Sequence, residues 1–426
     1  MDKINYHKTV IIVLPVIILL EITRIFYSAP SLYFFSRILL IYFIILSLLE
    51  FKLFKELKYF ILLIFLFSSW SLLTALWSYD PQITYPRAFY FAYVAAASTI
   101  GGYLWYKFFS NSVLSFLLSA NILIVIISFI SLITNKPENS WTGGCGIGFM
   151  GYAPHQNILG MMILFTIPPV LFRTFAYFSK NFFNYFSHSN KKNYVIMPPI
   201  LFFILLTSNV YLIILSHSRA SVLSLLLIIV TFVLFSFKWK IFLTSSLILI
   251  IFISALFFVI PDFGNKAINY ALKTEKNIGE RRYSQLEATI AAAKNGGIIG
   301  LGYGISDPKN ILPKDNPSEK RYYREKMISI LALVEEVGII GLILFLTLIG
   351  YVYARLLSLI SMDLHSNDEI KVAAKFIFTV LLGLSLNAQI EGWWLGPGSW
   401  QFLLFFTIIG SSLGIINRAQ SLKIQF

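Results

Sequence analysis

The sequence predicts an all-α protein of the polytopic membrane class, a helix bundle with about twelve transmembrane helices and one large loop outside the membrane. Of the 426 residues, 57% are hydrophobic and only 13% are charged, whereas an ordinary soluble domain has about 25% charged residues. Apolar runs of about 20 residues, the length that a helix needs to cross a bilayer, recur along the whole chain. Lipid offers the backbone no hydrogen-bond partners, so these runs are expected to be helices.

The apolar runs leave no room for a separate soluble domain, so residues 1–426 are treated as one integral membrane domain. The first span begins near Thr9 without a small-residue cleavage site behind it, and we expect a retained anchor rather than a signal peptide. The predicted spans are 9–28, 33–50, 58–77, 83–106, 112–133, 156–175, 196–216, 220–237, 240–261, 327–352, 371–388 and 399–417.

The distribution of Lys and Arg predicts how these spans are oriented, because short cytoplasmic loops are rich in both residues. Lys52, Lys191, Lys192 and Lys238 fall in links on the same side as the N-terminus, which is therefore expected to be cytoplasmic. These loops explain much of the net charge of +14, so no nucleic-acid partner is predicted.

The polar stretch 262–326 is predicted to be a large loop on the opposite side of the membrane. It holds twelve Lys and Arg against eight Asp and Glu, an excess that the rule for short loops does not explain. Leu286, Ile290 and Ala293 recur at helical spacing, so residues 283–294 are predicted to form an amphipathic helix on the bundle or on the bilayer.

Two features flank this predicted helix. Arg281 and Arg282 stand at its first turn, where a helix N-terminus also attracts anions. They are candidates for binding phosphate, and contact with solvent or lipid headgroups is the competing interpretation. The glycine-rich link 296–304 has no strand before it and no Lys-Ser/Thr pair after it, so it is not predicted to bind a nucleotide. We expect it to end the helix and turn the chain back.

The short polar turn 216–221, between two predicted spans, contains Arg219 and His217. The planar guanidinium of Arg219 suits two parallel hydrogen bonds to phosphate oxygens, although an Arg at a span boundary also extends to lipid headgroups. His217 is a candidate donor or base, and a surface histidine without a role is the alternative.

Arg324 and Lys326 precede the tenth predicted span and are further candidates for binding the substrate, and the span itself contains the pair Glu335 and Glu336. Carboxylates inside an apolar span must be paired or face a cavity. A structural salt bridge and a catalytic or substrate-orienting acid therefore both stay open for Glu336.

A Trp-rich segment precedes the last span, with Glu391 next to Gly392 and Trp393. Trp at this position is typical of an interfacial belt, and sugars also stack on aromatic rings, so Trp393 is a candidate glycan contact beside Glu391. The single Cys145 excludes an intramolecular disulfide and a redox thiol pair.

The order of these motifs resembles the O-antigen ligase and polymerase superfamily, bacterial membrane glycosyltransferases that act on undecaprenyl-diphosphate-linked glycans. The resemblance covers about residues 200–400. It rests on Ser-x-Ser-Arg ending at Arg219, on Arg282 opening a helix before the glycine-rich link, and on Ser329 to Gly341 in the next span. It implies a multi-pass protein of the bacterial inner membrane whose active site faces the periplasm, so that 262–326 is a periplasmic loop.

The resemblance further implies that Arg219 with Arg281 or Arg282 holds the lipid-linked diphosphate, that no cofactor or metal is needed, and that the acceptor is a glycan or a lipid. Members with ligase activity carry a His-Asn pair at the head of the tenth span, where this chain has Lys326, Met327 and Ile328. The base therefore stays open. Its candidates are Glu391, Glu336, His155 and His217, and the alternative is that no base is needed because positioning of the acceptor suffices.

We expect a polymerase or ligase for O-antigen or exopolysaccharide, with a polymerase preferred, and not a lipid A-core ligase. A transporter or flippase for lipid-linked glycans is the alternative. Such proteins place ionisable residues near the middle of the bilayer, whereas the charge here gathers at the predicted outer interface.

Overall fold

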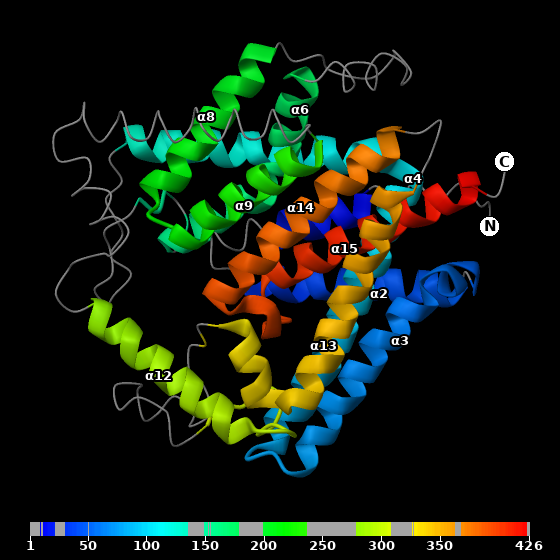
Figure 1. Cartoon of the computed structure of the whole chain (residues 1–426), viewed down its shortest axis with the longest axis vertical. Helices are drawn as coiled ribbons and strands as arrows, with labels where there is room; N and C mark the ends of the chain where they lie inside the picture. The colour runs from blue at the N-terminus through cyan, green and yellow to red at the C-terminus, as the bar shows by residue number, and fades with distance from the viewer. Residues whose placement is uncertain are drawn as a thin grey trace.

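The computed structural model describes residues 9, 12–21, 30–49, 51–134, 149–151, 153, 155–178, 199–236, 278–307, 326, 328–362 and 368–423. Within this part every regular element is a helix (Figure 1). The helices are α2 (Pro30–Leu49), α3 (Phe51–Leu73), α4 (Pro81–Ile133), α5 (Gln156–Thr166), α6 (Pro168–Phe178), α8 (Pro199–Leu215), α9 (Arg219–Ser236), α12 (Ile278–Gly296), α13 (Ser329–Ser361), α14 (Asp368–Glu391) and α15 (Trp400–Lys423), with the 3-10 turns η1 (Thr74–Leu76) and η3 (Trp393–Leu395).

The prediction of an all-α fold is confirmed for the described residues. Five of their helical segments are long and apolar enough to cross a membrane, or six if the bent pair α5 and α6 forms one span. Four shorter apolar helices, 12–21, 34–46, 200–215 and 219–235, fall within further predicted spans. The predicted span 240–261 lies outside the described residues. The number of twelve spans stays a prediction.

Two predicted span boundaries differ from the structure. The predicted spans 83–106 and 112–133 belong to the single helix α4 of 53 residues. The predicted link 107–111 is polar, but it contains no Pro or Gly that would end a helix. Conversely, the predicted span 156–175 is divided into α5 and α6 with a bend of 46°, because Pro168 and Pro169 lack the N–H groups that would continue the helix.

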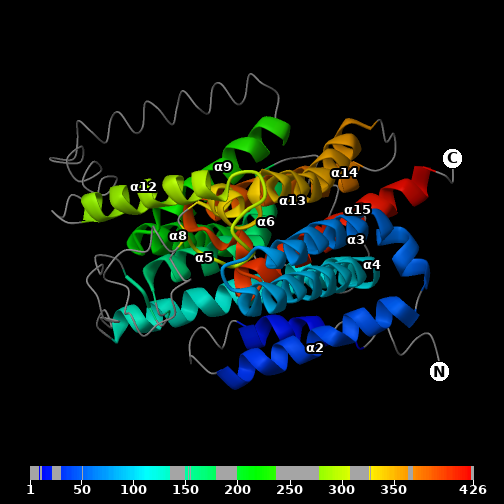
Figure 2. The same ribbon diagram turned by 90° about the horizontal axis from the view of Figure 1, so that it is seen from below.

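Helices α4 and α15 form the centre of the bundle (Figure 2). Their backbones nearly touch at two glycines. A Cβ atom on Gly102 would lie 2.0 Å from the carbonyl oxygen of Thr407, and a Cβ atom on Gly410 would lie 2.0 Å from that of Thr99. Small residues at such crossings let membrane helices approach closely.

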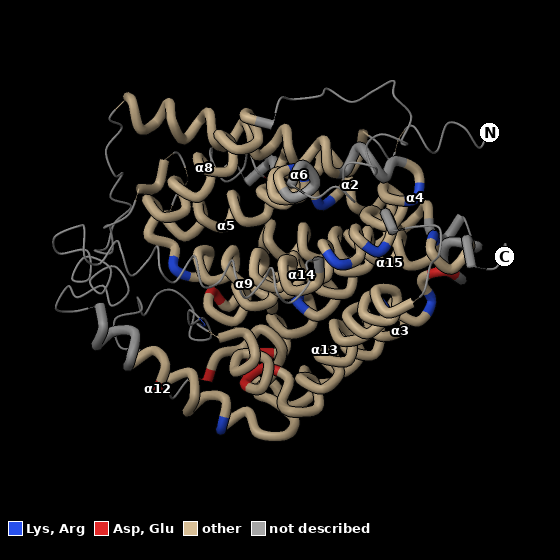
Figure 3. The backbone as a smooth tube through the Cα atoms, turned by 45° about the horizontal axis from the view of Figure 1, so that its top comes forward, with Lys and Arg blue, Asp and Glu red and all other residues tan. Residues whose placement is uncertain are grey.

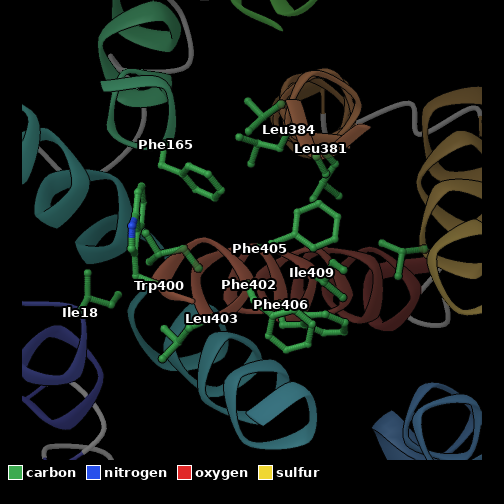
Figure 4. Packing of buried hydrophobic residues seen from close by; sticks show 14 of the residues in the cluster. Ile18, Phe165, Leu381, Leu384, Trp400, Phe402, Leu403, Phe405, Phe406 and Ile409 are labelled. Atoms are coloured by element: carbon green, nitrogen blue, oxygen red, sulfur yellow. The ribbon is translucent and has the colours of Figure 1, made fainter. Parts of the chain in front are cut away.

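The other face of α15 receives α14 and α5 (Figure 4). Leu381 and Leu384 of α14 point toward Phe405 of α15, and Phe165 of α5 packs edge-on against Trp400 with ring centroids 5.2 Å apart. Helix α14 also packs along α9. This packing brings the end of α14, the start of α5 and the start of α9 into one region.

Helix α13 is broken at Gly338, whose φ of 70° and ψ of −177° are not helical. Figure 1 shows its two parts running in different directions. The predicted glycine-rich link, which follows the end of α12, fills the break. The Leu301 and Gly302 amides donate to the carbonyl oxygens of Glu335 and Glu336 (2.9 and 3.0 Å), and the Ile339 and Ile340 amides donate to those of Gly297 and Ile298 (3.1 and 3.2 Å).

Glycine is required on both sides of this contact. Gly300 has φ 82°, and a Cβ atom on it would lie 2.4 Å from the carbonyl oxygen of Glu336. A Cβ atom on Gly338 would lie 2.1 Å from the carbonyl oxygen of Ile298. The link therefore ends α12 and turns back, as predicted, and it also replaces the hydrogen bonds that α13 loses at its break.

The predicted amphipathic helix is present as α12, and the face that packs on the bundle includes Ala293 of the predicted apolar face but not Ile290. Thr289, Ala292 and Ala293 are buried, whereas Ile290 is 39% exposed. Small residues face α13 because the backbones approach closely there, and a Cβ atom on Gly296 would lie 2.3 Å from the carbonyl oxygen of Val334. Ile290, Ile298 and Ile299 are left on the outer surface.

Candidate active site

The turn between α8 and α9 has the position that the sequence predicts. His217 adopts a left-handed conformation, with φ 53°, which is uncommon for a residue with a side chain and occurs at strained functional turns. Ser216 and Ser218 on either side are buried. The hydroxyl of Ser218 hydrogen-bonds to that of Ser221 at 2.9 Å. Arg219 is the first residue of α9 and is partly exposed.

Helix α5 packs directly on this turn. A Cβ atom on Gly160 would lie 2.4 Å from the Cβ atom of Ser218 and 2.9 Å from the hydroxyl of Ser221. Only a glycine at this position of α5 lets the turn come so close. The residue before Arg219 is thus held in contact with α5.

Helix α5 also binds the side chain of Glu391, the last residue of α14. The side-chain amide of Asn157 donates to both carboxylate oxygens of Glu391, at 3.1 Å each. His155 caps α5, and its Nδ1 accepts a hydrogen bond from the backbone amide of Asn157 at 3.1 Å. Asn157 and Gly160 are three residues apart, so they lie on one face of α5. The structure therefore brings together Glu391, His155 and the turn of His217 and Arg219.

A short segment around the end of α14 connects this region to α13. The hydroxyl of Ser329, at the start of α13, donates to the carbonyl oxygen of Ala388 at 2.7 Å. The Trp394 amide donates to the same hydroxyl at 3.3 Å, and the Ile330 amide donates to the side-chain oxygen of Gln389 at 3.1 Å. The start of α13 and the segment 387–394 form one hydrogen-bonded unit.

Trp393 does not have the exposed position that stacking on a sugar requires. Its side chain is 6% exposed, packs against Phe165 and Phe405, and donates from Nε1 to the side-chain oxygen of Asn387 at 3.0 Å. The apolar ring was predicted to lie at an interface, but the bundle extends far enough here to enclose it. Its role in this structure is to hold the segment 387–394 against the bundle.

Glu335 and Glu336 lie next to the break of α13 and are buried. Lys326 contacts both: its Nζ lies 2.5 Å from Oε1 of Glu336 and 3.5 Å from Oε2 of Glu335. Each carboxylate also accepts a backbone hydrogen bond, Glu336 from Gly304 at 2.6 Å and Glu335 from Asp307 at 2.8 Å. Figure 3 shows acidic residues gathered beside α12 and the start of α13.

These contacts favour the structural interpretation of Glu336 that the sequence left open. Its partner is Lys326, so the lysine that was predicted to bind substrate joins the glycine-rich link to α13. Because the break at Gly338 precedes the long apolar part of α13, Glu336 lies at the end of the first part of this helix.

Two further side chains secure the link, and sequence reasoning missed both. The guanidinium of Arg87, in α4, donates to the carbonyl oxygen of Gly304 at 2.8 Å. The buried ring of Tyr303 packs against Phe67 and Phe91. An Arg one turn into an apolar span was the signal that could have identified Arg87.

The remaining predicted phosphate ligands are placed only in part. Arg281 and Arg282 are the fourth and fifth residues of α12, and their side chains lie outside the described part, as does all of Arg324. In Figures 1 and 2 the start of α12 lies on the same side of the molecule as the turn between α8 and α9. Among the described residues, no three His, Cys, Asp or Glu side chains are grouped so that they could hold a metal ion.

The comparison with known families agrees with this arrangement. Residues 200–346 match the model of a family described as O-antigen ligase. The match covers about a third of the chain and includes α8, α9, α12 and the break of α13. No curated protein matches the chain. The match over residues 200–346 supports membership of the O-antigen ligase and polymerase superfamily.

Proposed function

We propose that this protein transfers or polymerises a glycan carried on undecaprenyl diphosphate, at the periplasmic face of the bacterial inner membrane. The observation that carries the proposal is the pair of contacts made by α5. Asn157 binds Glu391, and Gly160 packs on the turn that precedes Arg219. A carboxylate suited to act as base and the residue before a cation suited to bind phosphate thus both contact one face of one helix.

Arg219 holds the leaving diphosphate in this proposal, together with Arg281 or Arg282 at the start of α12. A helix N-terminus adds exposed N–H groups and a positive dipole at each of these positions. Guanidinium groups placed around the leaving group neutralise its charge as it develops in the transition state. The reaction therefore requires no metal ion in this proposal.

Glu391 acts as the base. It accepts the proton of an acceptor hydroxyl, and the hydroxyl oxygen forms the new bond to the anomeric carbon of the donor sugar. The bond from that carbon to the phosphate oxygen breaks, and lipid diphosphate leaves with the electron pair. The two hydrogen bonds from Asn157 fix the orientation of the carboxylate. Glu336 and Lys326 stabilise the glycine-rich link and do not take part in proton transfer.

The proposal includes the membrane topology that the sequence predicts, with about twelve spans and residues 262–326 in the periplasm. The described residues at the end of α12 and in the glycine-rich link support this topology. The glycine-rich link is anchored beside the short turn between α3 and α4, where Trp77 donates to the carbonyl oxygen of Gly300 at 3.0 Å. Ile298 and Ile299 are exposed beside it, as expected for a link at the membrane surface.

The purified protein in lipid nanodiscs provides the direct test. Given an undecaprenyl-diphosphate-linked oligosaccharide and an acceptor glycan, it should form a longer glycan and release undecaprenyl diphosphate in equal amounts. Mass spectrometry of both products measures this. In cells lacking the protein, shorter polymer would identify a polymerase, and normal polymer that stays lipid-linked would identify a ligase.

Transport of the lipid-linked glycan is a second candidate, and one observation favours it. Arg37 in α2 and Glu21 form a buried pair at 3.3 Å within two predicted spans, and intramembrane ion pairs occur along transport pathways. Arg37 also donates to the carbonyl oxygen of Gly398 at 3.2 Å, which favours a structural role. Movement of the donor across a proteoliposome membrane without release of diphosphate would establish transport instead.

A further inference from the structure

The segment 387–394 contains three buried N–H donors without a hydrogen-bond partner among the described residues. They are Nδ2 of Asn387, Nε2 of Gln389 and Nε1 of Trp394. In each residue another polar atom is already bonded. Asn387 accepts from Trp393, Gln389 accepts from the Ile330 amide, and the Trp394 backbone amide donates to Ser329. These bonds hold the side chains or backbone in place and leave the three donors unused.

Three unused donors within eight residues are costly for the fold. A buried donor without an acceptor costs about 1–3 kcal/mol in desolvation, and native proteins contain few such groups. All three are neutral N–H groups, which bind the oxygen lone pairs of hydroxyl, ether or carbonyl groups and do not bind a cation. A sugar, which offers several hydroxyl and ether oxygens close together, fits these donors.

Part of the segment reaches the surface. Gln389, Glu391 and Gly392 are partly exposed, whereas Asn387 and Trp394 are buried behind them. Gly392 has φ 64°, a conformation that only glycine adopts readily, and it lies between the end of α14 and η3.

We propose that the segment 387–394 is the subsite for the acceptor sugar, with Gln389 and Trp394 donating hydrogen bonds to its oxygens while Glu391 faces the reacting hydroxyl. This inference rests on the proposed transferase function and adds the residues that select the acceptor. Asn387 provides a third donor and also anchors Trp393.

Trp394→Phe is the principal test. It keeps an aromatic ring for the packing against Phe345 and removes the unused donor, together with part of the volume of the indole. We expect a KM for the acceptor that is about threefold to tenfold higher, from the loss of one neutral hydrogen bond, and an unchanged KM for the lipid-linked donor. The melting temperature carries two opposing effects, the loss of an unpaired buried donor and the smaller volume of the phenyl ring, so the acceptor KM is the readout that decides.

Gln389→Glu is the second variant. It keeps an oxygen for the Ile330 amide and replaces the donor with an acceptor, so we expect the same selective rise in acceptor KM. Thr99→Val is the matched control. Thr99 is buried in α4, its hydroxyl also has no partner among the described residues, and it lies outside the segment. This variant should leave both KM values unchanged.

A set of monodeoxy acceptors separates direct contact from an indirect effect. One monodeoxy acceptor should bind the wild-type protein more weakly than the complete acceptor does. Trp394→Phe should bind that monodeoxy acceptor and the complete acceptor equally well, because the variant has already lost the same hydrogen bond. The proposal is wrong if both variants keep the wild-type acceptor KM, or if Trp394→Phe lowers the melting temperature without changing KM, as expected when a buried water bonds the donor. If the wild-type protein transfers no glycan at all, it is the proposed function that fails.

Discussion

Asn157 and Glu391 are 234 residues apart in the chain, and the side-chain amide nitrogen of Asn157 lies 3.1 Å from each carboxylate oxygen of Glu391. A single N–H₂ group thus holds both oxygens, so the carboxylate has one orientation relative to α5. Since α5 also packs against the turn before Arg219, the relative position of the proposed base and the proposed phosphate ligand is set by one short helix. The first two predictions follow from this arrangement.

Glu391→Gln should lower the rate of glycan transfer by about 10²–10⁴-fold, the usual contribution of a positioned base, and leave binding of the lipid-linked donor intact. Turnover in nanodiscs and a donor-binding assay measure the two effects. Asn157→Ala should lower the rate less, because the carboxylate is present but less well oriented. Wild-type turnover by Glu391→Gln would exclude Glu391 as the base and direct attention to His155 or His217.

Arg219→Ala and Arg282→Ala should each abolish transfer while the protein still inserts and folds, because each removes charge from the proposed diphosphate site. Arg219→Lys should also fail if the contact is bidentate, since an ammonium group cannot make two parallel hydrogen bonds. Arg355→Lys, near the other end of α13, is the control and should be fully active. A double Arg219→Lys, Arg282→Lys variant with full activity would indicate headgroup contacts only, and activity lost to EDTA and restored by Mg²⁺ would assign the charge neutralisation to a metal.

Lys326→Met should destabilise the protein by about 3–5 kcal/mol, because it leaves two buried carboxylates without their cation. A thermal unfolding curve in detergent checks this, and adding Glu336→Gln to the same chain should restore part of the loss. Glu336→Gln alone should lower stability with a near-normal rate per folded molecule. A folded Glu336→Gln variant without transfer activity would place Glu336 among the catalytic residues.

Gly102→Ala and Gly410→Ala should each destabilise the contact between α4 and α15 by about 1–3 kcal/mol, as overpacking of a close contact does. In both cases the new methyl group would overlap a backbone carbonyl oxygen at 2.0 Å, which no side-chain movement relieves. Gly350→Ala is a matched control, since nothing lies within 4 Å of its added Cβ atom. Equal melting temperatures for all three variants would contradict the close approach of the two helices.

Cysteine labelling tests the proposed topology. In a chain with Cys145→Ser, a cysteine at Asn316 should react with a membrane-impermeant reagent in cells with a permeabilised outer membrane, whereas a cysteine at Asn190 should not. Both positions lie outside the described residues, and their sides are predicted from the distribution of Lys and Arg. The reverse labelling pattern would invert the orientation and exclude a periplasmic active site.

The sequence by itself determined the class of fold and several local features. An apolar run that is long enough to cross a bilayer is expected to form a helix, whatever its neighbours are, because lipid offers its backbone no hydrogen-bond partners. The turn at His217 and Arg219 and the end of α12 before the glycine-rich link follow from short stretches of polar residues and glycine, whose preferences are local. The motifs between Arg219 and Gly341 were also sufficient to identify the superfamily, which the family match over residues 200–346 confirms.

Only the tertiary structure decided which partner each polar group has. Lys326 pairs with Glu336 because the glycine-rich link enters the break of α13, and Glu391 meets Asn157 because α14 and α5 both pack on α15. Trp393 is buried for the same reason. Hydropathy ranks residues by their cost of transfer into lipid, but it carries no information about which helices become neighbours. The choice of neighbours depends on close contacts at residues such as Gly102, Gly160 and Gly338, whose importance appears only when the facing backbone is known.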